Sequence, residues 1–492
     1  MTDLLETKQL GELSIAVREL PADLETPVSV YLKLAGKGPS FLLESVTGGE
    51  QVARYSFIGA HPRRAFVFRG GQVTVETTNG TRPDQAYRRE TVMGPFEVLR
   101  RVIQEAGSAG IRPQPGLPRF SGGLVGYLGY ETVRFIEPTV PLELPSDIPE
   151  SIFLEADSLV AFDHALNRLV LMARGPDGGG RLDEMEHMLN QGLEIPPPGI
   201  NGRLDGKQTD LQSNMTREQF VGAVLKAKEH ILAGDIFQAV LSQRLSRETN
   251  ASPLAIYRSL RRLNPSPYMY FFDFSGLSSV GAEPLFMVGA SPEMHVRLEG
   301  RTATMRPIAG TRRRGSSPDE DQALEAEMLA DPKERAEHTM LVDLARNDLG
   351  RVCKYGSLDV PIKMSVEHYS HVMHIVSQVE GELRPELDAF DLMDATFPAG
   401  TVSGAPKVRA MQIIQDLESQ PRGPYAGAVG YFSYDGSMDT CITIRTLVMQ
   451  GKTVSVQAGA GIVADSVPES EYQETLDKAR ALIAAVEKAE GG

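Results

Sequence analysis

Apolar and polar residues follow different patterns in the two parts of this chain. Residues 1–190 contain short apolar stretches bounded by turn residues, and residues 72–77 alternate with the two-residue period of a half-buried strand. From Thr216 onward, apolar positions recur at helical spacing in several segments. The pattern therefore predicts a first part built from strands and turns with few long helices, and a second part in which long helices alternate with strands.

Four segments of the second part have the apolar spacing of helices. The first covers residues 217–234, the second 318–330 and the fourth 468–488, and the third begins at residue 332. Thr216 can form a capping box with Gln219 before the first of them. Asp331 precedes the third, and we expect Glu334 to close a second capping box there. The dense apolar run after Glu337 predicts that this third helix is buried on most sides.

Strands are expected between these helices. They cover residues 269–274, 286–291, 293–300, 302–310, 442–449 and 453–463. The glycine-rich segment 457–463 is interpreted as a loop leading to the last helix, and Gly310–Thr311 as a turn after a strand. Backbone N–H groups in such segments can point at an anion, although the same residues also occur in ordinary tight turns.

The order of these segments predicts an α/β or α+β protein with two parts. Residues 1–190 form the N-terminal part and residues 216–492 the C-terminal part. Residues 191–215 are rich in proline, glycine and polar residues and are interpreted as a linker.

Composition narrows the class of function. The 492 residues carry a net charge of −15, which disfavours a nucleic-acid partner. An acidic protein can still bind an anion if it concentrates cations or a metal ion locally. No apolar run is long enough for a membrane span, and the acidic N-terminus does not have the pattern of a secretory signal. Two cysteines are consistent with a reducing compartment, so we expect a cytoplasmic protein.

Two acidic helices are candidates for metal binding. Glu334, Glu337 and His338 share one face of the third helix, while Glu471, Glu474 and Lys478 share a face of the last helix. Such stripes are often only solvated surface. Carboxylates that converge from two segments would suit a Mg²⁺ ion that also binds water and substrate oxygens. Spacing alone does not decide between these two possibilities.

Other reactive side chains are few. His374 lies in an alternating apolar segment, where it can be a core residue or a catalytic one. Cys353 and Cys441 lack metal-ligand spacing, and the chain has no Gly-x-Cys-x-Gly nucleophile motif. We therefore expect the chain to carry no glutaminase of its own.

Five motifs resemble those of the chorismate-utilising enzymes and occur in the order found in that family. They are ASPE (residues 290–293), RPIAGT (306–311), EHTMLVDLARND (337–348), AGTVSGAPK (399–407) and QAGAG (457–461). The N-terminal part resembles the anthranilate-forming members through LLES (42–45) and RYSFIG (54–59). The resemblance implies an α+β fold, a large α/β sandwich with two facing, mainly antiparallel sheets and outer helices.

The resemblance also implies how chorismate is bound. Glu337 and Glu474 match Mg²⁺ ligands, with Glu334 and Glu471 supporting them. Contacts with the substrate are implied for Gly310, Thr311, Tyr425, Arg445, Gly459, Ala460, Gly461 and Lys478. Among these, Tyr425 and Arg445 match the groups that hold the enolpyruvyl carboxylate.

Three further residues match catalytic positions of the family. Glu293 matches the general acid for departure of the C4 hydroxyl, a role that requires a protonated carboxyl. His374 matches the histidine of the second half-reaction, in which the C2 proton and pyruvate are lost. Thr401 matches a hydroxyl that orients the substrate or this histidine.

Two positions indicate which nucleophile is used. Gln238 stands where water-activating relatives have lysine, and glutamine cannot act as a general base. Ala309 stands where aminodeoxychorismate synthase, the nearest alternative, has a nucleophilic lysine. Both residues favour external ammonia at C2 and hence anthranilate, the product of the first committed step of tryptophan biosynthesis. A catalytically silent tryptophan-binding subunit is a second alternative, which the intact motifs disfavour.

An effector and a partner protein are also implied. LLES and NPSPYM (264–269) resemble the two halves of a tryptophan feedback site, with Glu44, Ser45, Pro267, Tyr268 and Met269 in contact with tryptophan. Glu44 or a backbone carbonyl would pair with the amino group of tryptophan, and Cys441 matches a position near the pocket. NPSPYM can also be an ordinary turn before a strand. A separate glutamine amidotransferase is expected to supply ammonia, in a heterotetramer if the family's usual assembly applies.

Overall fold

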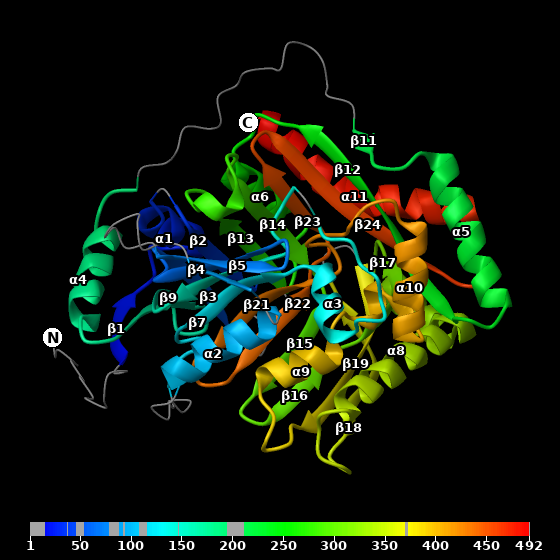
Figure 1. Ribbon diagram of the computed structural model, residues 1–492, viewed down its shortest axis with the longest axis horizontal. Helices are drawn as coiled ribbons and strands as arrows, with labels where there is room; N and C mark the ends of the chain where they lie inside the picture. The colour runs from blue at the N-terminus through cyan, green and yellow to red at the C-terminus, as the bar shows by residue number, and fades with distance from the viewer. Residues whose placement is uncertain are drawn as a thin grey trace.

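The computed structural model describes residues 15–491 except 37, 46–53, 78–87, 92–93, 108–115, 146, 194–210 and 370–371. Most of the expected linker at 191–215 therefore lies outside the described residues. The described strands form two sheets of twelve strands, and every pairing between them is antiparallel (Figure 1). The α+β sandwich implied by the resemblance is confirmed.

The first sheet contains strands from both parts of the chain. In spatial order these are β1 (Ile15–Pro21), β10 (Arg168–Arg174), β9 (Ser158–Asp163), β3 (Tyr55–Ala60), β2 (Ser40–Glu44), β13 (Tyr268–Asp273), β14 (Leu285–Ser291), β23 (Thr446–Gln450), β24 (Thr453–Ile462), β12 (Gln238–Glu248) and β11 (Gln212–Ser213), with β20 (Gly404–Ala405) paired to β12. Leu42 of β2 lies opposite Phe271 of β13, so the N-terminal and C-terminal parts join in the middle of this sheet.

The second sheet is built in the same way. In spatial order it contains β17 (Ile308–Arg313), β19 (Val372–Glu382), β16 (Thr302–Met305), β15 (Met294–Glu299), β22 (Met438–Ile442), β21 (Ala428–Ser433), β7 (Gly123–Leu128), β8 (Ser151–Ala156), β4 (Arg64–Arg69), β5 (Gln72–Thr77) and β6 (Arg88–Thr91), with β18 (Asp359–His368) paired to β19. Its two halves join at β7 and β21, where Gly126 lies opposite Gly430. These glycines allow the neighbouring backbones to approach closely, because a Cβ on either would collide with a carbonyl oxygen of the next strand.

Large aromatic side chains fill the space between the sheets. Phe41, Phe57 and Tyr270 of the first sheet belong to the same buried cluster as Tyr127 and Tyr431 of the second. Burying one such ring stabilises the fold by about 3 kcal/mol. This shared core explains why the strands of the two parts of the chain are held at fixed positions relative to one another.

Helices cover the outer faces of both sheets (Figure 1). They are α1 (Pro27–Leu34), α2 (Pro95–Gly107), α3 (Val133–Ile136), α4 (Gly178–Leu189), α5 (Arg217–Leu232), α6 (Pro253–Leu263), α7 (Pro318–Ala330), α8 (Pro332–Gly350), α9 (Ala389–Thr396), α10 (Lys407–Leu417) and α11 (Pro468–Gly491), with short 3₁₀ helices at Tyr130–Thr132, Ser278–Val280 and Gly400–Val402. The four predicted helices are α5, α7, α8 and α11, and the Thr216–Gln219 capping box is present. The helices α1, α2 and α4 were not predicted, although Phe96, Leu99 and Val102 give α2 a buried face.

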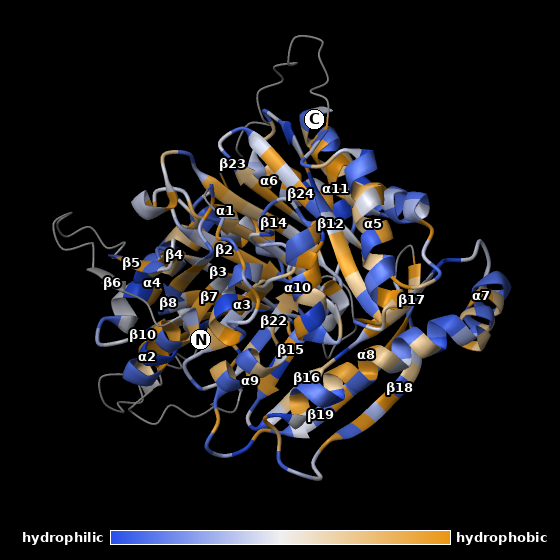
Figure 2. Cartoon of the chain, turned by 45° about the vertical axis from the view of Figure 1, so that its right-hand side comes forward, coloured by the Kyte–Doolittle hydropathy of each residue, from blue (hydrophilic) through white to orange (hydrophobic). Residues whose placement is uncertain are grey.

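Two expectations about α8 were wrong. Asp331 caps the helix by accepting from the N–H groups of Lys333 and Glu334, but the Glu334 carboxylate binds Arg312 instead of returning to the cap. The helix is also amphipathic, since Leu341 is buried whereas Asp343 is exposed. Figure 2 shows this mixture of hydrophobic and hydrophilic residues along α8.

Three segments near the site differ from their predicted structure. Residues 457–462 belong to β24 and are not a loop, because they pair with β12 as far as Ile462. Gly310 lies inside β17, at a register shift between Ala309 and Thr311, and not in a turn after the strand. The two long strands predicted at 302–310 and 442–449 are each divided, the second by Arg445, which has a φ of 49°.

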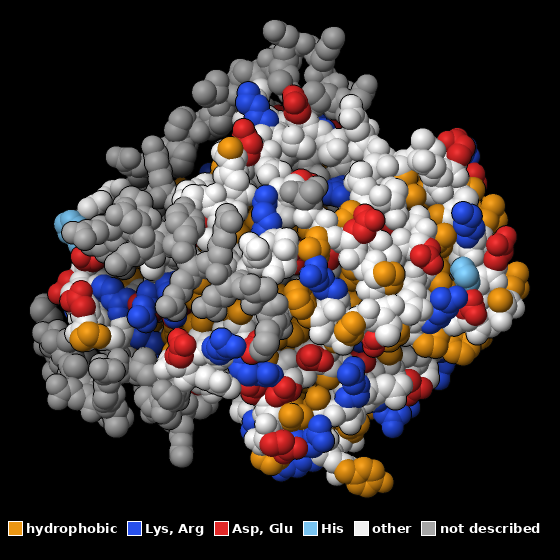
Figure 3. All heavy atoms as spheres, viewed as in Figure 1, with side chains coloured by type: hydrophobic (Ala, Val, Ile, Leu, Met, Phe, Trp, Pro, Cys, Tyr) orange, Lys and Arg blue, Asp and Glu red, His pale blue; other side chains and the backbone are white. Residues whose placement is uncertain are grey.

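The surface agrees with the expectations drawn from composition. On the face seen in Figure 3, acidic and basic side chains are interspersed, so the net negative charge does not form one continuous patch there. Within the described ranges, no helix combines the length and apolar character needed to cross a membrane.

Candidate active site

A broad pocket lies where α6 and α11 of one layer face β19 of the other. It encloses about 1430 Å³ of empty space, part of it open to solvent. Four of the predicted site residues line it: His374 of β19, Arg445 between β22 and β23, and Glu474 and Lys478 of α11. Residues distant in sequence are therefore brought together around a cavity large enough for a small organic dianion.

The acidic helices α8 and α11 approach one another beside this pocket. The pKa of Glu337 is raised by burial and further by the negative charges of Glu334 and Glu474. Burial also raises the pKa of Glu471. Lys478 lies 2.7 Å from a Glu474 oxygen and donates to the Gly459 carbonyl at 3.0 Å, so α11 is tied to β24. The carboxylates form an anionic cluster only partly neutralised by lysine.

The donor atoms of this cluster are compatible with Mg²⁺. Among the described residues no group of three or more His, Cys, Asp or Glu side chains is arranged as a ready metal site. Glu337 and Glu474 nevertheless come from two helices, and the negative charge of Glu474 helps to raise the pKa of Glu337, a cost that a cation would relieve. Two carboxylates with water and substrate oxygens are a typical set for Mg²⁺. Binding of Mg²⁺ remains a prediction.

His374 is held in one tautomer by β17. Its Nδ1 donates to the Gly310 carbonyl at 3.0 Å, because a carbonyl oxygen can only accept. The Thr311 hydroxyl lies 3.0 Å from the same nitrogen, and Tyr369 packs edge-on against the ring. Burial lowers the pKa of His374, so the ring is neutral near pH 7 and Nε2 is a free acceptor. Gly310, at a φ of 68°, thus contributes by orienting His374.

Glu293 lies in the turn between β14 and β15, next to the broad pocket. Pro292 lines that pocket, whereas the Glu293 side chain lines a smaller cavity together with Thr401. Burial raises the pKa of Glu293 to about 8, since the neighbouring Thr401 hydroxyl and the positive charges of Arg445 and Lys478 offset this effect only in part. A carboxyl group that stays protonated at neutral pH can donate a proton to a leaving group.

Tyr425 lies beside the glycine-rich strand β24 and lines a smaller pocket, not the broad one. A Cβ on Gly459 would lie 2.5 Å from the Tyr425 hydroxyl, so this position requires glycine. The pairing of β24 with β23 ends at Val456, whereas its pairing with β12 continues to Ile462. One edge of the segment containing Gly459, Ala460 and Gly461 is therefore not paired with β23. Backbone N–H groups on that edge can face an anion.

A buried ion pair fixes the segment that carries Thr401. Lys407 Nζ lies 2.7 Å from Asp348 Oδ2 at the end of α8 and also donates to the Thr396 carbonyl. Replacing Lys407 by methionine is expected to reduce the free energy of unfolding by about 3 kcal/mol, because Asp348 would be left buried and unpaired. Denaturant titration would measure this loss. The double variant Lys407→Met/Asp348→Leu is expected to recover most of it, and an equal loss in both variants would contradict this explanation.

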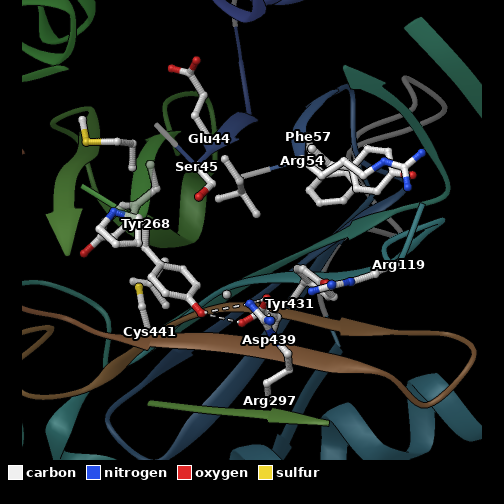
Figure 4. Close-up of a pocket in the computed structure, with 17 residues that line it drawn as sticks. Glu44, Ser45, Arg54, Phe57, Arg119, Tyr268, Arg297, Tyr431, Asp439 and Cys441 are labelled. Atoms are coloured by element: carbon white, nitrogen blue, oxygen red, sulfur yellow. Dashed lines mark hydrogen bonds and ion pairs between the residues drawn. The ribbon is translucent and has the colours of Figure 1, made fainter. Parts of the chain in front are cut away.

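A second pocket lies between the sheets (Figure 4). It encloses about 680 Å³ and is lined by all five residues of the predicted effector site, Glu44, Ser45, Pro267, Tyr268 and Met269, and by Cys441. The Glu44 carboxylate is bound by Arg261 and by the Tyr257 hydroxyl. The Ser45 hydroxyl is buried and has no hydrogen-bond partner among the described residues.

Comparison with known proteins defines the class. Residues 95–484 match the chorismate binding enzyme family, and the chain belongs to this family of chorismate-utilising enzymes. Curated relatives named anthranilate synthase component 1 include those of Thermus thermophilus (47% identical, covering 96% of this chain and 97% of the relative) and Synechocystis (45% identical, covering 98% and 97%). The crystal structure of anthranilate synthase component I from Streptococcus pneumoniae is similar at a TM-score of 0.73, with 37% identity over 94% of this chain and 98% of that chain.

Several features of the site could not be found from sequence patterns. The Tyr369 ring against His374 and the Lys407–Asp348 pair depend on segments that come together only in the folded protein. Lys407 ends the AGTVSGAPK motif, and Asp348 ends the EHTMLVDLARND motif. The presence of Lys407 and Asp348 in two family motifs, with opposite charges, was the only sequence feature that could have suggested this contact.

Proposed function

We propose that this enzyme converts chorismate and ammonia to anthranilate, pyruvate and water. The observation that carries the proposal is the absence of a nucleophilic or basic side chain at Ala309 and Gln238, the two positions where relatives with other nucleophiles have lysine. Both residues are buried, and Gln238 Nε2 would lie 2.6 Å from a Cβ on Gly461. The names of the relatives support the same activity.

Substrate binding follows from the charges around the broad pocket. Arg445 can hold the enolpyruvyl carboxylate through paired N–H donors, with Tyr425 beside it. The N–H groups of Gly459 to Gly461 can bind a second carboxylate. Mg²⁺, held by Glu337 and Glu474 when bound, would supply positive charge to the ring carboxylate. These groups explain how an acidic protein can bind a dianion.

The chemistry divides into two steps, each with its own proton-transfer group. Ammonia forms a bond to ring C2, the double bonds shift, and the C4–O bond breaks as Glu293 gives its proton to the departing oxygen, which leaves as water. His374 then takes the C2 proton through Nε2 while the C3–O bond breaks and pyruvate leaves. Thr401 lies beside Glu293 and orients the substrate for the first step.

A fluorescence assay for anthranilate tests this function. Chorismate and ammonium chloride at high pH are expected to give product in the presence of Mg²⁺. No product with Mg²⁺ present would contradict the proposal. Product formed equally well without Mg²⁺, after treatment with a chelator, would contradict only the metal requirement.

The pH dependence should report the ionisation of Glu293. The acid form of Glu293 is required, and its pKa is about 8. The rate divided by the concentration of free ammonia is therefore expected to fall as pH rises through about 8, whereas His374 is already neutral below that range. Initial rates from pH 6.5 to 9.5 would measure this (~3 pH units, enough to define one ionisation). A corrected rate that increases through this range would contradict the role of Glu293.

We further propose that a glutamine amidotransferase supplies the ammonia. Both cysteines of the chain are buried, and burial raises the pKa of Cys353 to about 11 and also raises the pKa of Cys441. Neither thiol is suited to attack glutamine, because the thiolate is the nucleophile. The names of the relatives, component 1, imply a second component. Product formation from glutamine by this chain alone would contradict the proposal.

We also propose that tryptophan binds the pocket in Figure 4 as an effector. Because Arg261 already neutralises Glu44, the amino group of tryptophan would be bound by backbone carbonyls and the Ser45 hydroxyl. Residues 264–266 line the broad pocket and residues 267–269 line this one, so one segment contacts both. That continuity offers a physical route by which binding at one pocket changes the other.

Coupling between the two pockets can be measured directly. Tryptophan is expected to weaken equilibrium binding of chorismate by at least about fivefold. Ser45→Phe, which fills the pocket, should abolish this effect while leaving the rate with ammonia intact, and Ser45→Ala serves as the matched control. Equal chorismate affinity with and without tryptophan in the wild-type protein would contradict the coupling.

A further inference from the structure

A smaller cavity beside Glu293 encloses about 340 Å³ of empty space, part of it open to solvent. It is lined by Glu293, His295, Arg306, Leu344, Ala345 and Thr401, among other residues. These residues come from β15, from α8, from the segment between β16 and β17, and from the 3₁₀ helix at Gly400–Val402. None of the expectations drawn from the sequence assigns this cavity a function.

Three lining residues carry a buried polar atom that has no hydrogen-bond partner among the described residues. These atoms are His295 Nδ1, Arg306 Nε and Thr401 Oγ1, the last of which is also close enough to the Glu293 carboxyl to act on its pKa. Leaving such an atom without a partner is unfavourable, because the hydrogen bonds it makes to water in the unfolded chain are not replaced. Three of them around one cavity indicate that the cavity accommodates a small polar ligand.

The hydrogen-bonding character of the three atoms defines that ligand. His295 is 2% exposed, and its Nε2 donates to the Thr396 carbonyl at 3.2 Å. Burial lowers the pKa of His295 to about 4, so the ring is neutral and Nδ1 can only accept. Arg306 Nε can only donate, and the Thr401 hydroxyl can do both. A ligand that donates and accepts at once is required, and water does so with two to four partners.

The position of the cavity relates it to the chemistry. Pro292 lines the broad pocket, and the next residue, Glu293, lines this cavity. The Glu293 backbone is fixed by the Ile442 N–H, which donates to its carbonyl at 3.1 Å. Glu293 lines this cavity, and its carboxyl is close enough to Arg445 and Lys478, which line the broad pocket, for their charges to act on it.

We propose that this cavity is a water-binding site that receives the water formed from the C4 hydroxyl and returns a proton to Glu293. The proposal rests on the proposed function. Glu293 loses its proton as the C4–O bond breaks, so its carboxylate must be protonated again before the next turnover. The new ammonium group at C2 releases one proton to solvent, and water in the cavity delivers one proton to Glu293, so the protons balance. His295 is a positioning residue that orders this water through Nδ1.

A high-resolution crystal structure of the unliganded protein tests the site without reference to activity. Ordered water is expected within hydrogen-bond distance of at least two of the three unpartnered atoms. A dry cavity, or one in which the three atoms are satisfied by protein groups, would overturn the proposal. This measurement does not depend on turnover. If the protein failed to form anthranilate, the proposed reaction would be wrong, but the crystal structure would still show whether the cavity binds water.

Substitution of His295 tests the proton transfer. His295→Phe keeps a flat ring beside Phe397, whose centroid is 5.9 Å away, but removes the acceptor. We expect kcat to fall about tenfold with KM unchanged and the solvent isotope effect on kcat to increase. His295→Asn, which retains an acceptor, should recover part of the rate. Wild-type kcat and isotope effect in His295→Phe, or an equal loss in both variants, would overturn the role of His295.

Discussion

Replacing Glu474 by alanine is expected to lower the rate of anthranilate formation about 1000-fold while the protein stays folded. Glu474 lines the broad pocket, contributes to the raised pKa of Glu337, and is one of two predicted Mg²⁺ ligands. Its side chain is about half exposed (47%), so its removal creates no cavity in the core. The loss should therefore appear in turnover and in Mg²⁺ affinity, not in stability.

Glu469→Ala is the matched control for this variant. Glu469 lies on the same helix but forms an exposed ion pair with Arg217 and does not line the pocket. Its replacement should leave the rate within about twofold of wild type, because exposed ion pairs contribute little. Fluorescence rates, a Mg²⁺ titration and circular dichroism would be compared for the three proteins. Retention of more than a tenth of the wild-type rate by Glu474→Ala would contradict the metal assignment.

Replacing His374 by alanine is expected to separate the two steps of the reaction. The imidazole Nε2 is the acceptor assigned to the C2 proton, whereas Glu293 acts in the amination. Anthranilate formation should fall by about 100-fold or more, while chorismate is still converted to an aminated, non-aromatic intermediate that has lost water. Mass spectrometry of the reaction mixture would detect this compound.

Tyr369→Phe provides the control for His374→Ala. It keeps the ring that packs against His374 and removes only the hydroxyl that donates to Glu367. Both steps should continue in this variant. If His374→Ala instead slowed chorismate consumption and anthranilate formation equally, with no intermediate, the assignment of His374 to the second step would be wrong.

Local signals in the sequence predicted the helices best. The capping box at Thr216 and proline at the start of α7 and α8 are short-range features, and the structure contains all three helices at the predicted starts. Strand pairing was not predictable in this way. No sequence pattern predicts that β7 lies beside β21, because this pairing depends on contacts between distant segments.

Glycine-rich segments were the least predictable near the site. Residues 457–463 fit both the strand predicted at 453–463 and a glycine-rich loop, and the strand is correct because β12 pairs with them as far as Ile462. Gly310 is expected in a turn, whereas it lies at a bulge in β17, where its carbonyl accepts a hydrogen bond from His374. In both cases the deciding interaction comes from a neighbouring strand.

The candidate site itself was predictable only through the family motifs. Spacing left Glu337 and Glu474 as two separate stripes, and the structure places Glu474 close enough for its charge to raise the pKa of Glu337. The sequence could not show that Arg261 and Tyr257 donate hydrogen bonds to the Glu44 carboxylate, since these residues lie on α6, more than 200 positions away.

The central claim is that the missing reactive side chains at Ala309 and Gln238 leave the attack on C2 to external ammonia. Incubation with chorismate, Mg²⁺ and ¹⁵N-labelled ammonium, followed by mass spectrometry, tests it most directly. We predict anthranilate that carries the label, with an equal amount of pyruvate, and no chorismate isomer when ammonium is left out. Formation of isochorismate without ammonium, or of aminodeoxychorismate with it, would contradict the claim.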